Sequence, residues 1–210
     1  MAWAARLLLP GFIHRPNSAG GDNLLLGDSM KNDFEIRGDV TAIFLRNKNG
    51  EIIETLIDTA DLTIADSVRN RWYAHKTSSG DYYVMLIDQK AQGKKTVILH
   101  RLLMGNPEGY LVDHINHNTL DNRRSNLRVV TNTENQQNRK GANSDNKVSK
   151  VLGVSWHKSR KKWQARVQVN KKEVYLGVFD CIQEAEKAVL DARARLLPFS
   201  KEAQLAGGKS

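Results

Sequence analysis

The most regular alternation of hydrophobic and polar residues lies near the C-terminus, between residues 163 and 169. A period of two predicts a strand with one buried face and one exposed face. A strand-like run at 173–179 follows, a shorter run begins after Gly153, and small apolar residues recur at helical spacing over 182–196. These patterns predict three short antiparallel strands and one helix. The strand residues expected to face that helix are Trp163, Ala165, Val167 and Val169.

A second group of β-rich runs lies in the first half of the chain. The segment Asn47-Lys48-Asn49-Gly50 separates two of these runs and is a strong hairpin signal. Thr59 begins a stretch that is predicted to form a short helix with Thr59 as its cap. Together the runs predict a small β-rich lobe. Its predicted strands cover residues 40–45, 52–57, 72–74, 82–87 and 96–100, and its predicted helix covers residues 59–70.

Between these two regions the pattern predicts a strand, a polar loop, a returning strand and a helix. The loop is rich in Asn and Asp, which favour turns because their side chains bond to nearby backbone. Thr131 with Glu134 three residues later fits a capping box, so a helix is expected from Asn132 onward. The predicted strands cover residues 112–115 and 126–130, and the loop covers residues 116–125.

The predicted elements describe an α+β protein with three folded regions. The apolar run at residues 2–9 is too short to cross a membrane, and our hypothesis is that Met30 is the true start. The expected organisation is a disordered extension over 1–29, a small β-rich lobe over 30–96, the strand–loop–strand–helix unit over 97–140, a linker over 141–150, a C-terminal domain of a three-stranded antiparallel sheet and one helix over 151–198, and a tail over 199–210.

Charge and cysteine content narrow the classes of partner. The chain has 210 residues and a formal net charge of +9, which favours a polyanionic partner. Residues 147–210 carry 14 Lys and Arg against 6 Asp and Glu, so most of the positive surplus belongs to the C-terminal region. Cys181 is the only cysteine, which excludes a disulfide within the chain and a Cys-rich zinc site. We interpret Cys181 as a small, half-buried residue.

The central unit contains residues suited to a metal-dependent hydrolysis. Its strand–loop–strand–helix order can bring Asp113 and Asn135 together. Their carboxylate and amide oxygens are hard ligands, suited to one divalent ion, Mg²⁺ or Mn²⁺. His114 follows directly, and an imidazole with a pKa near neutrality can take a proton from a water molecule that attacks a phosphodiester. These residues predict a metal ion next to a general base.

The same residues resemble the motif of HNH endonucleases of the phage and homing (mobile-element) type. The resemblance is carried by Leu111-Val112-Asp113-His114-Ile115-Asn116, by residues 120–128 and by Glu134-Asn135. It implies a ββα-metal finger in which His114 is the general base, Asn126 is the catalytic-motif residue that pins the loop, and Asn135 replaces the last His of the motif as a metal ligand. His117 departs from the family, whose members usually have Gly there; if the backbone needs a positive φ, His carries a modest steric cost.

Several basic residues flank the motif. His100-Arg101-Leu102 resembles a segment that precedes the finger in those nucleases, and Arg101 is expected to contact a phosphate. His100 is interpreted as a structural histidine, as is His75. The other candidate phosphate contacts near the cleft are Arg123, Arg124 and Arg128.

Residues 151–198 resemble the plant ethylene-response-factor (Apetala) DNA-binding domain. In that family the sheet enters the major groove, which is about 12 Å wide. Members place Arg at positions that are Ser155, Gln168 and Glu173 here, so their target preference does not transfer. By this resemblance Gln164, Arg166, Gln168 and Tyr175 are expected to contact bases, and Lys158, Arg160, Lys161 and Lys162 to hold phosphates.

The sequence favours a metal-dependent DNA endonuclease that hydrolyses phosphodiester bonds and is directed to its target by a separate sheet-type DNA-binding domain. The alternative from another class is a non-catalytic DNA-binding regulator with a degenerate HNH unit. An RNA-binding protein has less support, because the sequence shows no pair of aromatic residues on an exposed strand. The expected partner is double-stranded DNA, bound by a monomer or weak dimer in the cytoplasm of a bacterium or phage-infected host. A membrane and a small-molecule cofactor are not expected.

Overall fold

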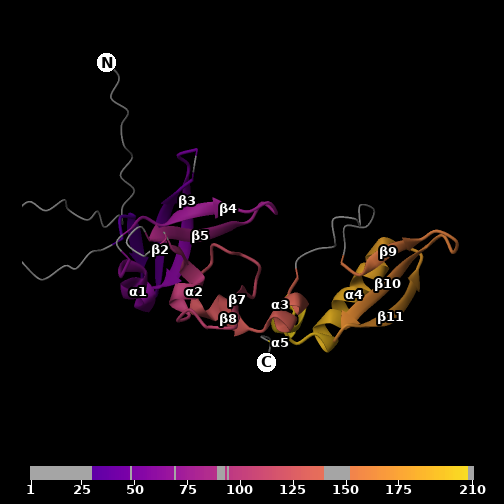
Figure 1. The fold of residues 1–210 in the computed structure, drawn as a ribbon. Coiled ribbons are helices and arrows are strands. Elements are labelled where there is room, and N and C mark those ends of the chain that lie inside the picture. The colour runs from indigo at the N-terminus through magenta and orange to yellow at the C-terminus, as the bar shows by residue number, and fades with distance from the viewer. Residues whose placement is uncertain are drawn as a thin grey trace, which may run out of the picture. The chain divides into compact units, whose positions relative to one another are not determined.

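The computed structural model describes residues 30–47, 49–68, 70–88, 93, 95–139 and 152–207 (Figure 1). The chain divides into two compact units. The first unit contains the described residues up to Glu108 together with Asn118–Val129, and the second contains Gly109–His117 together with the described residues from Val130 onward. The predicted extension over 1–29 and the predicted linker over 141–150 lie outside the described residues. Mixed helices and small sheets confirm the α+β class.

The first sheet of unit 1 is built around the predicted hairpin. Strands β1 (Phe34–Arg37), β2 (Val40–Arg46) and β3 (Ile52–Asp58) are antiparallel in the order β1-β2-β3. The hairpin turn is held by Asn47, whose Oδ1 accepts hydrogen bonds from the backbone N–H groups of Asn49 and Glu51, both at 2.9 Å. Strand β1 was not predicted. It is short and carries charges, so its pairing with β2, rather than its own pattern, stabilises it.

The helix predicted over residues 59–70 is shorter than expected, and its predicted cap is wrong. A 3₁₀ turn η1 (Thr59–Asp61) leads into α1 (Leu62–Asp66), and no side chain caps either element. The Thr59 hydroxyl instead donates to the Gly38 carbonyl oxygen at 2.8 Å and lies 3.0 Å from the Thr41 hydroxyl. Because the Thr59 hydroxyl bonds to the β1–β2 turn and to β2, it does not accept a hydrogen bond from the helix N-terminus.

The second sheet of unit 1 contains β4 (Tyr73–Lys76), β5 (Tyr82–Asp88) and β6 (Lys95–Ile98), in the order β4-β5-β6. The strand predicted over residues 96–100 is wrong at its end, because Leu99 and His100 begin α2 (Leu99–Leu103). Both residues are buried in this helix. His100 packs with its ring centroid 5.6 Å from that of Tyr83, which fits its interpretation as a structural histidine.

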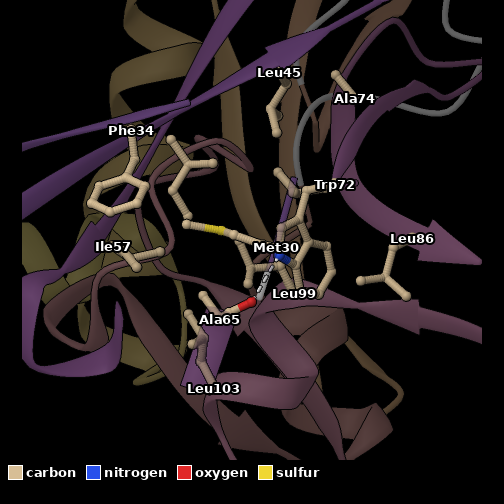
Figure 2. Packing of buried hydrophobic residues seen from close by; sticks show 12 residues of the cluster. Met30, Phe34, Leu45, Ile57, Ala65, Trp72, Ala74, Leu86, Leu99 and Leu103 are labelled. Carbon is tan, nitrogen blue, oxygen red and sulfur yellow. Dashed lines mark hydrogen bonds between the residues drawn. The ribbon is translucent and has the colours of Figure 1, made fainter. Parts of the chain in front are cut away.

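Trp72 is at the centre of the core of unit 1 (Figure 2). Its side chain is fully buried, and its indole Nε1 donates to the Ala65 carbonyl oxygen at 3.1 Å. The buried Asn32 amide joins this core to the chain around it, accepting from the Trp72 N–H at 2.7 Å and donating to the Trp72 and Phe44 carbonyl oxygens, both at 2.9 Å. Burial of Trp72 contributes substantially to stability, since large apolar side chains contribute most when fully desolvated.

The central elements agree with the predicted strand–loop–strand–helix order. They are β7 (Leu111–His114), the 3₁₀ turn η2 (Arg124–Asn126), β8 (Leu127–Val130) and α3 (Asn132–Gln137). Strands β7 and β8 form a two-stranded sheet. The predicted capping box is confirmed: the Glu134 N–H donates to the Thr131 hydroxyl at 3.2 Å, and the Glu134 carboxylate accepts from the Thr131 N–H at 2.7 Å.

The C-terminal sheet of unit 2 also agrees with prediction. Strands β9 (Val154–His157), β10 (Lys162–Val169) and β11 (Lys172–Phe179) are antiparallel in the order β11-β10-β9, and α4 (Ile182–Leu196) covers one face (Figure 1). The predicted helix-facing residues are confirmed, because Ala165 and Val167 are buried against α4 and Trp163 and Val169 pack beside them. A further helix, α5 (Lys201–Gly207), was not predicted.

The buried guanidinium of Arg193 joins α4 to the end of α3 within unit 2. Its side chain is 6% exposed; Nε donates to the Glu202 carboxylate at 3.1 Å, and a terminal nitrogen donates to the Gln137 carbonyl oxygen at 3.0 Å. The Gln137 side-chain oxygen in turn accepts from the Phe199 N–H at 3.2 Å. No helix among the described residues is both long and apolar enough to span a bilayer.

Candidate functional site

The candidate base and the candidate carboxylate lie at the end of β7. Burial alternates along this strand: Asp113 is half-buried, while Val112 and His114 are buried, and His114 is 4% exposed. The strand ends at His114, and the His117 N–H donates to the His114 carbonyl oxygen at 3.1 Å, which closes a turn directly after it. Asp113 and His114 are therefore adjacent residues at a strand end, as the sequence predicted.

A residue that the sequence analysis missed, Asn138, joins β7 to the end of α3. Its side chain is 4% exposed, and Nδ2 donates to the Asp113 carboxylate at 2.9 Å and to the His114 carbonyl oxygen at 3.1 Å. Asn135 precedes Asn138 by three residues, and residues at this spacing share one face of a helix. The bond of Asn138 to Asp113 therefore ties the end of α3 to β7, and the two elements are in contact.

His117 also contacts Asn138, through the backbone and side-chain oxygens of that residue. Its φ is 65°, which confirms that this loop position needs the left-handed conformation for which glycine is favoured. Its ring Nε2 lies 2.7 Å from the Asn138 backbone oxygen and 2.9 Å from the Asn138 side-chain oxygen. Because both neighbours are acceptors, Nε2 carries the proton. The departure from glycine thus adds a side-chain contact that glycine cannot make.

The loop between the two strands is held within unit 1. Asn126 is 5% exposed, and its Nδ2 donates to the Asp121 carbonyl oxygen at 2.7 Å. The loop also pairs with the outer edge of β3, where the Leu56 N–H donates to the Leu120 oxygen at 2.9 Å and the Asn122 N–H donates to the Leu56 oxygen at 2.7 Å. A buried Asn126 amide that bonds to loop backbone is consistent with a residue that pins the loop.

Three of the arginines proposed as phosphate contacts have partners within unit 1. Arg123 bonds to the Asp121 carboxylate at 2.7 Å, and Arg124 bonds to the Asp61 carboxylate at 2.8 Å. These hydrogen bonds raise the pKa of both guanidinium groups above the ordinary arginine value. Arg101 donates to the Pro107 carbonyl oxygen at 2.9 Å. Arg123 and Arg124 therefore have part of their charge neutralised locally, which the sequence did not indicate.

The donor set fits one hard divalent ion. The described residues contain no group of three or more His, Cys, Asp or Glu side chains that could hold a metal ion. The candidate set is instead one carboxylate, Asp113, and one amide oxygen, Asn135, which leaves the other positions to water and phosphate. Mg²⁺ commonly binds in this way, through one or two carboxylates plus substrate phosphate.

The outward face of the C-terminal sheet carries the predicted base-contacting residues. Arg166 on β10 pairs with Tyr175 on β11, and Tyr175 is 53% exposed. The register of the two strands shifts between Ala165 and Arg166. Arg166 donates to the Glu173 carboxylate at 2.9 Å and to the Gln164 side-chain oxygen at 2.7 Å. Gln164, Arg166 and Tyr175 thus lie on one face, with Arg166 held by its neighbours, and Gln168 is exposed beside them.

The basic turn before β10 is exposed. Lys158, Arg160 and Lys161 are exposed, and Lys161 has a φ of 51°. Lys162 is half-buried and bonds to Asp180 at 3.0 Å. The turn therefore presents cations to solvent at the end of the sheet, where they can meet an anionic backbone.

Comparison with known proteins shows what the central segment is similar to. Residues 100–137 match the family model described as HNH endonuclease. The chain is also similar to Protein 3.8 of Escherichia phage T7, with 37% identity over 67 residues, which are 32% of this chain and 54% of that protein. The chain thus spans about half the length of this curated relative. No solved structure matches.

The HNH match includes every predicted residue of the metal and base site. It begins at His100, covers Asp113, His114 and Asn126, and ends two residues after Asn135. Asn138 lies directly beyond the matched segment, and the C-terminal sheet lies outside it as well. The match to the HNH endonuclease model is therefore confined to the central segment of the chain.

Proposed function

We propose that this protein is an endonuclease that depends on Mg²⁺ or Mn²⁺ and cuts double-stranded DNA, with the C-terminal sheet as a separate DNA-binding domain. The observation that carries the proposal is the Asn138–Asp113 hydrogen bond of 2.9 Å. It ties β7, which carries Asp113, to the residue directly after α3, the helix that carries Asn135, and both of these elements lie within the segment that matches the HNH model.

In this function Asp113 and Asn135 hold the metal ion. When bound, such an ion supplies positive charge beside the phosphate and the departing 3′ oxygen. The His114 imidazole accepts a proton from water as the water oxygen forms a bond to phosphorus. The bond from phosphorus to the 3′ oxygen breaks, and that oxygen leaves with a proton from solvent, giving a 5′ phosphate and a 3′ hydroxyl. Asn126 keeps the loop in shape through its bond to the Asp121 oxygen.

Binding of DNA is divided between two sets of residues in this proposal. In unit 1, Arg101 and Arg128 contact phosphates, whereas Arg123 and Arg124 contribute less because carboxylates already hold them. On the C-terminal sheet, Gln164, Arg166, Gln168 and Tyr175 meet base edges. The cations of the turn, Lys158, Arg160, Lys161 and Lys162, hold phosphates and make the affinity depend on salt.

The experiment that tests this proposal uses supercoiled plasmid carrying DNA from the vicinity of the protein's own gene. The plasmid is incubated with the full chain and Mg²⁺, Mn²⁺ or EDTA, and the ends of the products are mapped. We expect metal-dependent cleavage with 5′-phosphate ends at defined positions. Binding of the plasmid in gel shift without any nick in either metal would refute the nuclease and support the non-catalytic DNA-binding regulator instead.

A further inference from the structure

We infer that Asn138, held by His117, is a positioning residue that orients the Asp113 carboxylate for metal binding. The inference rests on the proposed function, in which Asp113 is a metal ligand. It assigns roles to two residues outside the predicted ligand and base set: Asn138 lies directly beyond the segment that matches the HNH model, and His117 lies in the loop after β7.

The hydrogen bonds of the Asn138 side chain define its orientation. Nδ2 donates to Asp113 Oδ2 at 2.9 Å and to the His114 carbonyl oxygen at 3.1 Å, and Oδ1 accepts from His117 Nε2 at 2.9 Å. Both amide protons are therefore used, and the oxygen faces away from the carboxylate. If the Asn138 amide were flipped, its Oδ1 would face the Asp113 carboxylate oxygen and its Nδ2 would face the protonated Nε2 of His117. Both contacts would be unfavourable, so the contact with His117 keeps Nδ2 directed toward Asp113.

Burial makes this arrangement rigid. Asn138 is 4% exposed, so water does not readily replace a lost partner, and an unpaired buried amide is costly. The bond to Asp113 reaches only one carboxylate oxygen, Oδ2. A fixed donor on Oδ2 limits rotation of the carboxylate, so the direction of Oδ1 is set as well. Partners of this kind orient metal ligands, and their loss typically lowers metal affinity by about 10–100-fold.

His117 holds Asn138 through two hydrogen bonds from Nε2, and its backbone adopts an unfavourable conformation to do so. Its φ of 65° brings the ring to the end of α3, where Nε2 also meets the Asn138 backbone oxygen at 2.7 Å. This oxygen belongs to the last turn of the helix, whose carbonyl groups lack partners within the helix. His117 therefore both closes the helix end and prevents the Asn138 side chain from turning.

The test compares Asn138→Ala with Gln136→Ala, which removes an exposed amide from the same helix. Binding of Mn²⁺ to the full chain is measured by electron paramagnetic resonance, and plasmid cleavage is measured over a Mg²⁺ titration. We expect Asn138→Ala to weaken Mn²⁺ binding about 10–100-fold and to raise the Mg²⁺ midpoint of cleavage by the same factor, with the maximal rate largely recovered at high Mg²⁺. Gln136→Ala should leave both values unchanged, and DNA affinity in EDTA should be the same in all three proteins.

A second variant, His117→Gly, keeps the test decisive if Asn138→Ala does not fold. Glycine adopts the required positive φ readily, so this change removes the ring without straining the loop. We expect its Mn²⁺ affinity to fall between those of the wild type and Asn138→Ala. Unchanged Mn²⁺ binding in Asn138→Ala, or in His117→Gly when the former is unfolded, would overturn the inference. A loss of cleavage in Asn138→Ala that no Mg²⁺ concentration recovers, with normal Mn²⁺ binding, would overturn it as well.

The outcomes separate the inference from the proposed function. A wild-type protein that binds Mn²⁺ but never cuts DNA would refute the nuclease, while a weakened Mn²⁺ site in Asn138→Ala would still support the role of Asn138. A wild-type protein that neither binds Mn²⁺ nor cuts would overturn both.

Discussion

The polar loop between β7 and β8 and the C-terminal sheet use polar residues in opposite ways. In the loop Asn122 and Asn126 are buried, and their amides bond to partners within unit 1. In the C-terminal sheet the apolar face packs on α4, while Gln164, Arg166 and Tyr175 lie on the other face. This contrast fits the proposed function, in which the loop belongs to a catalytic segment that buried hydrogen bonds hold in place, and the outward face of the sheet contacts DNA and needs its polar groups outside. Four experiments test this contrast.

The largest effect is expected for His114→Ala. In the proposed mechanism the general base contributes about 10²–10⁴-fold to the rate, so plasmid cleavage should fall by at least that factor. The C-terminal sheet is untouched by the change, so the affinity for DNA in a gel shift should stay the same. Persistent cutting by this variant in Mg²⁺ would show that His114 is not the base, and a parallel loss of DNA binding would show that the two regions are not independent.

Gly153→Ala should disrupt the C-terminal sheet. Gly153 has a φ of 86°, and a Cβ there would lie 2.2 Å from the Arg166 carbonyl oxygen. We expect a loss of at least about 2 kcal/mol in the free energy of unfolding, since the left-handed conformation alone costs about 1–2 kcal/mol for a residue with a Cβ. Thermal unfolding followed by circular dichroism measures this loss. The control is Gly105→Ala, at a φ of 76° with open space around it; equal losses in the two variants would show that the close approach to Arg166 does not matter.

Asn122→Ala should destabilise unit 1 by about 1–3 kcal/mol, because it removes one partner of a buried hydrogen bond. Its Nδ2 donates to the Thr55 hydroxyl at 2.8 Å, and the residue is 0% exposed. Urea unfolding gives the change in free energy, and cleavage should decrease while DNA affinity is kept. Ser125→Ala changes an exposed residue of the same loop and should be neutral. If both variants unfold at the same urea concentration, the buried amide is not what holds the loop.

The smallest effect is expected for Glu173→Gln. Glu173 holds Arg166 at 2.9 Å, so its neutralisation should remove a negative charge from the proposed DNA-contacting face and raise the net positive charge of that face by one. The slope of the logarithm of affinity against the logarithm of salt concentration should then steepen by about 0.9. Glu184→Gln removes the same charge from an exposed position on α4 and should leave the slope unchanged. Equal slopes in the two variants would show that the charge of Glu173 does not affect DNA binding.

Patterns within a single segment predicted much of this fold. The alternation at residues 163–169 and the helical spacing at 182–196 predicted β10 and α4, and Thr131 with Glu134 predicted the start of α3. Strand β1 and the use of the Thr59 hydroxyl could not be found in this way, because both depend on partners elsewhere in the sheet.

In the candidate site, too, the features that lie within one segment were predicted, and a contact between distant residues was not. Asp113, His114, Asn126 and Asn135 stand at the spacing of a known motif, whereas the bond of Asn138 to Asp113 crosses from a helix end to a strand. A positive φ at His117 was considered, as a condition on the loop, from the residue that relatives carry there. The contact that its ring makes was not, because a sequence pattern does not indicate which way a ring turns.

Strand β3 lies at the margin of its sheet, and such margins expose amides and carbonyls that can recruit strands from other molecules. Here the Leu56 amide and carbonyl are already engaged by Leu120 and Asn122. The segment that carries Asn126 therefore occupies backbone groups that could otherwise pair with a strand of another molecule. Loosening that segment should lower the concentration at which the protein aggregates, so poor solubility and poor cutting are expected to appear in the same variants.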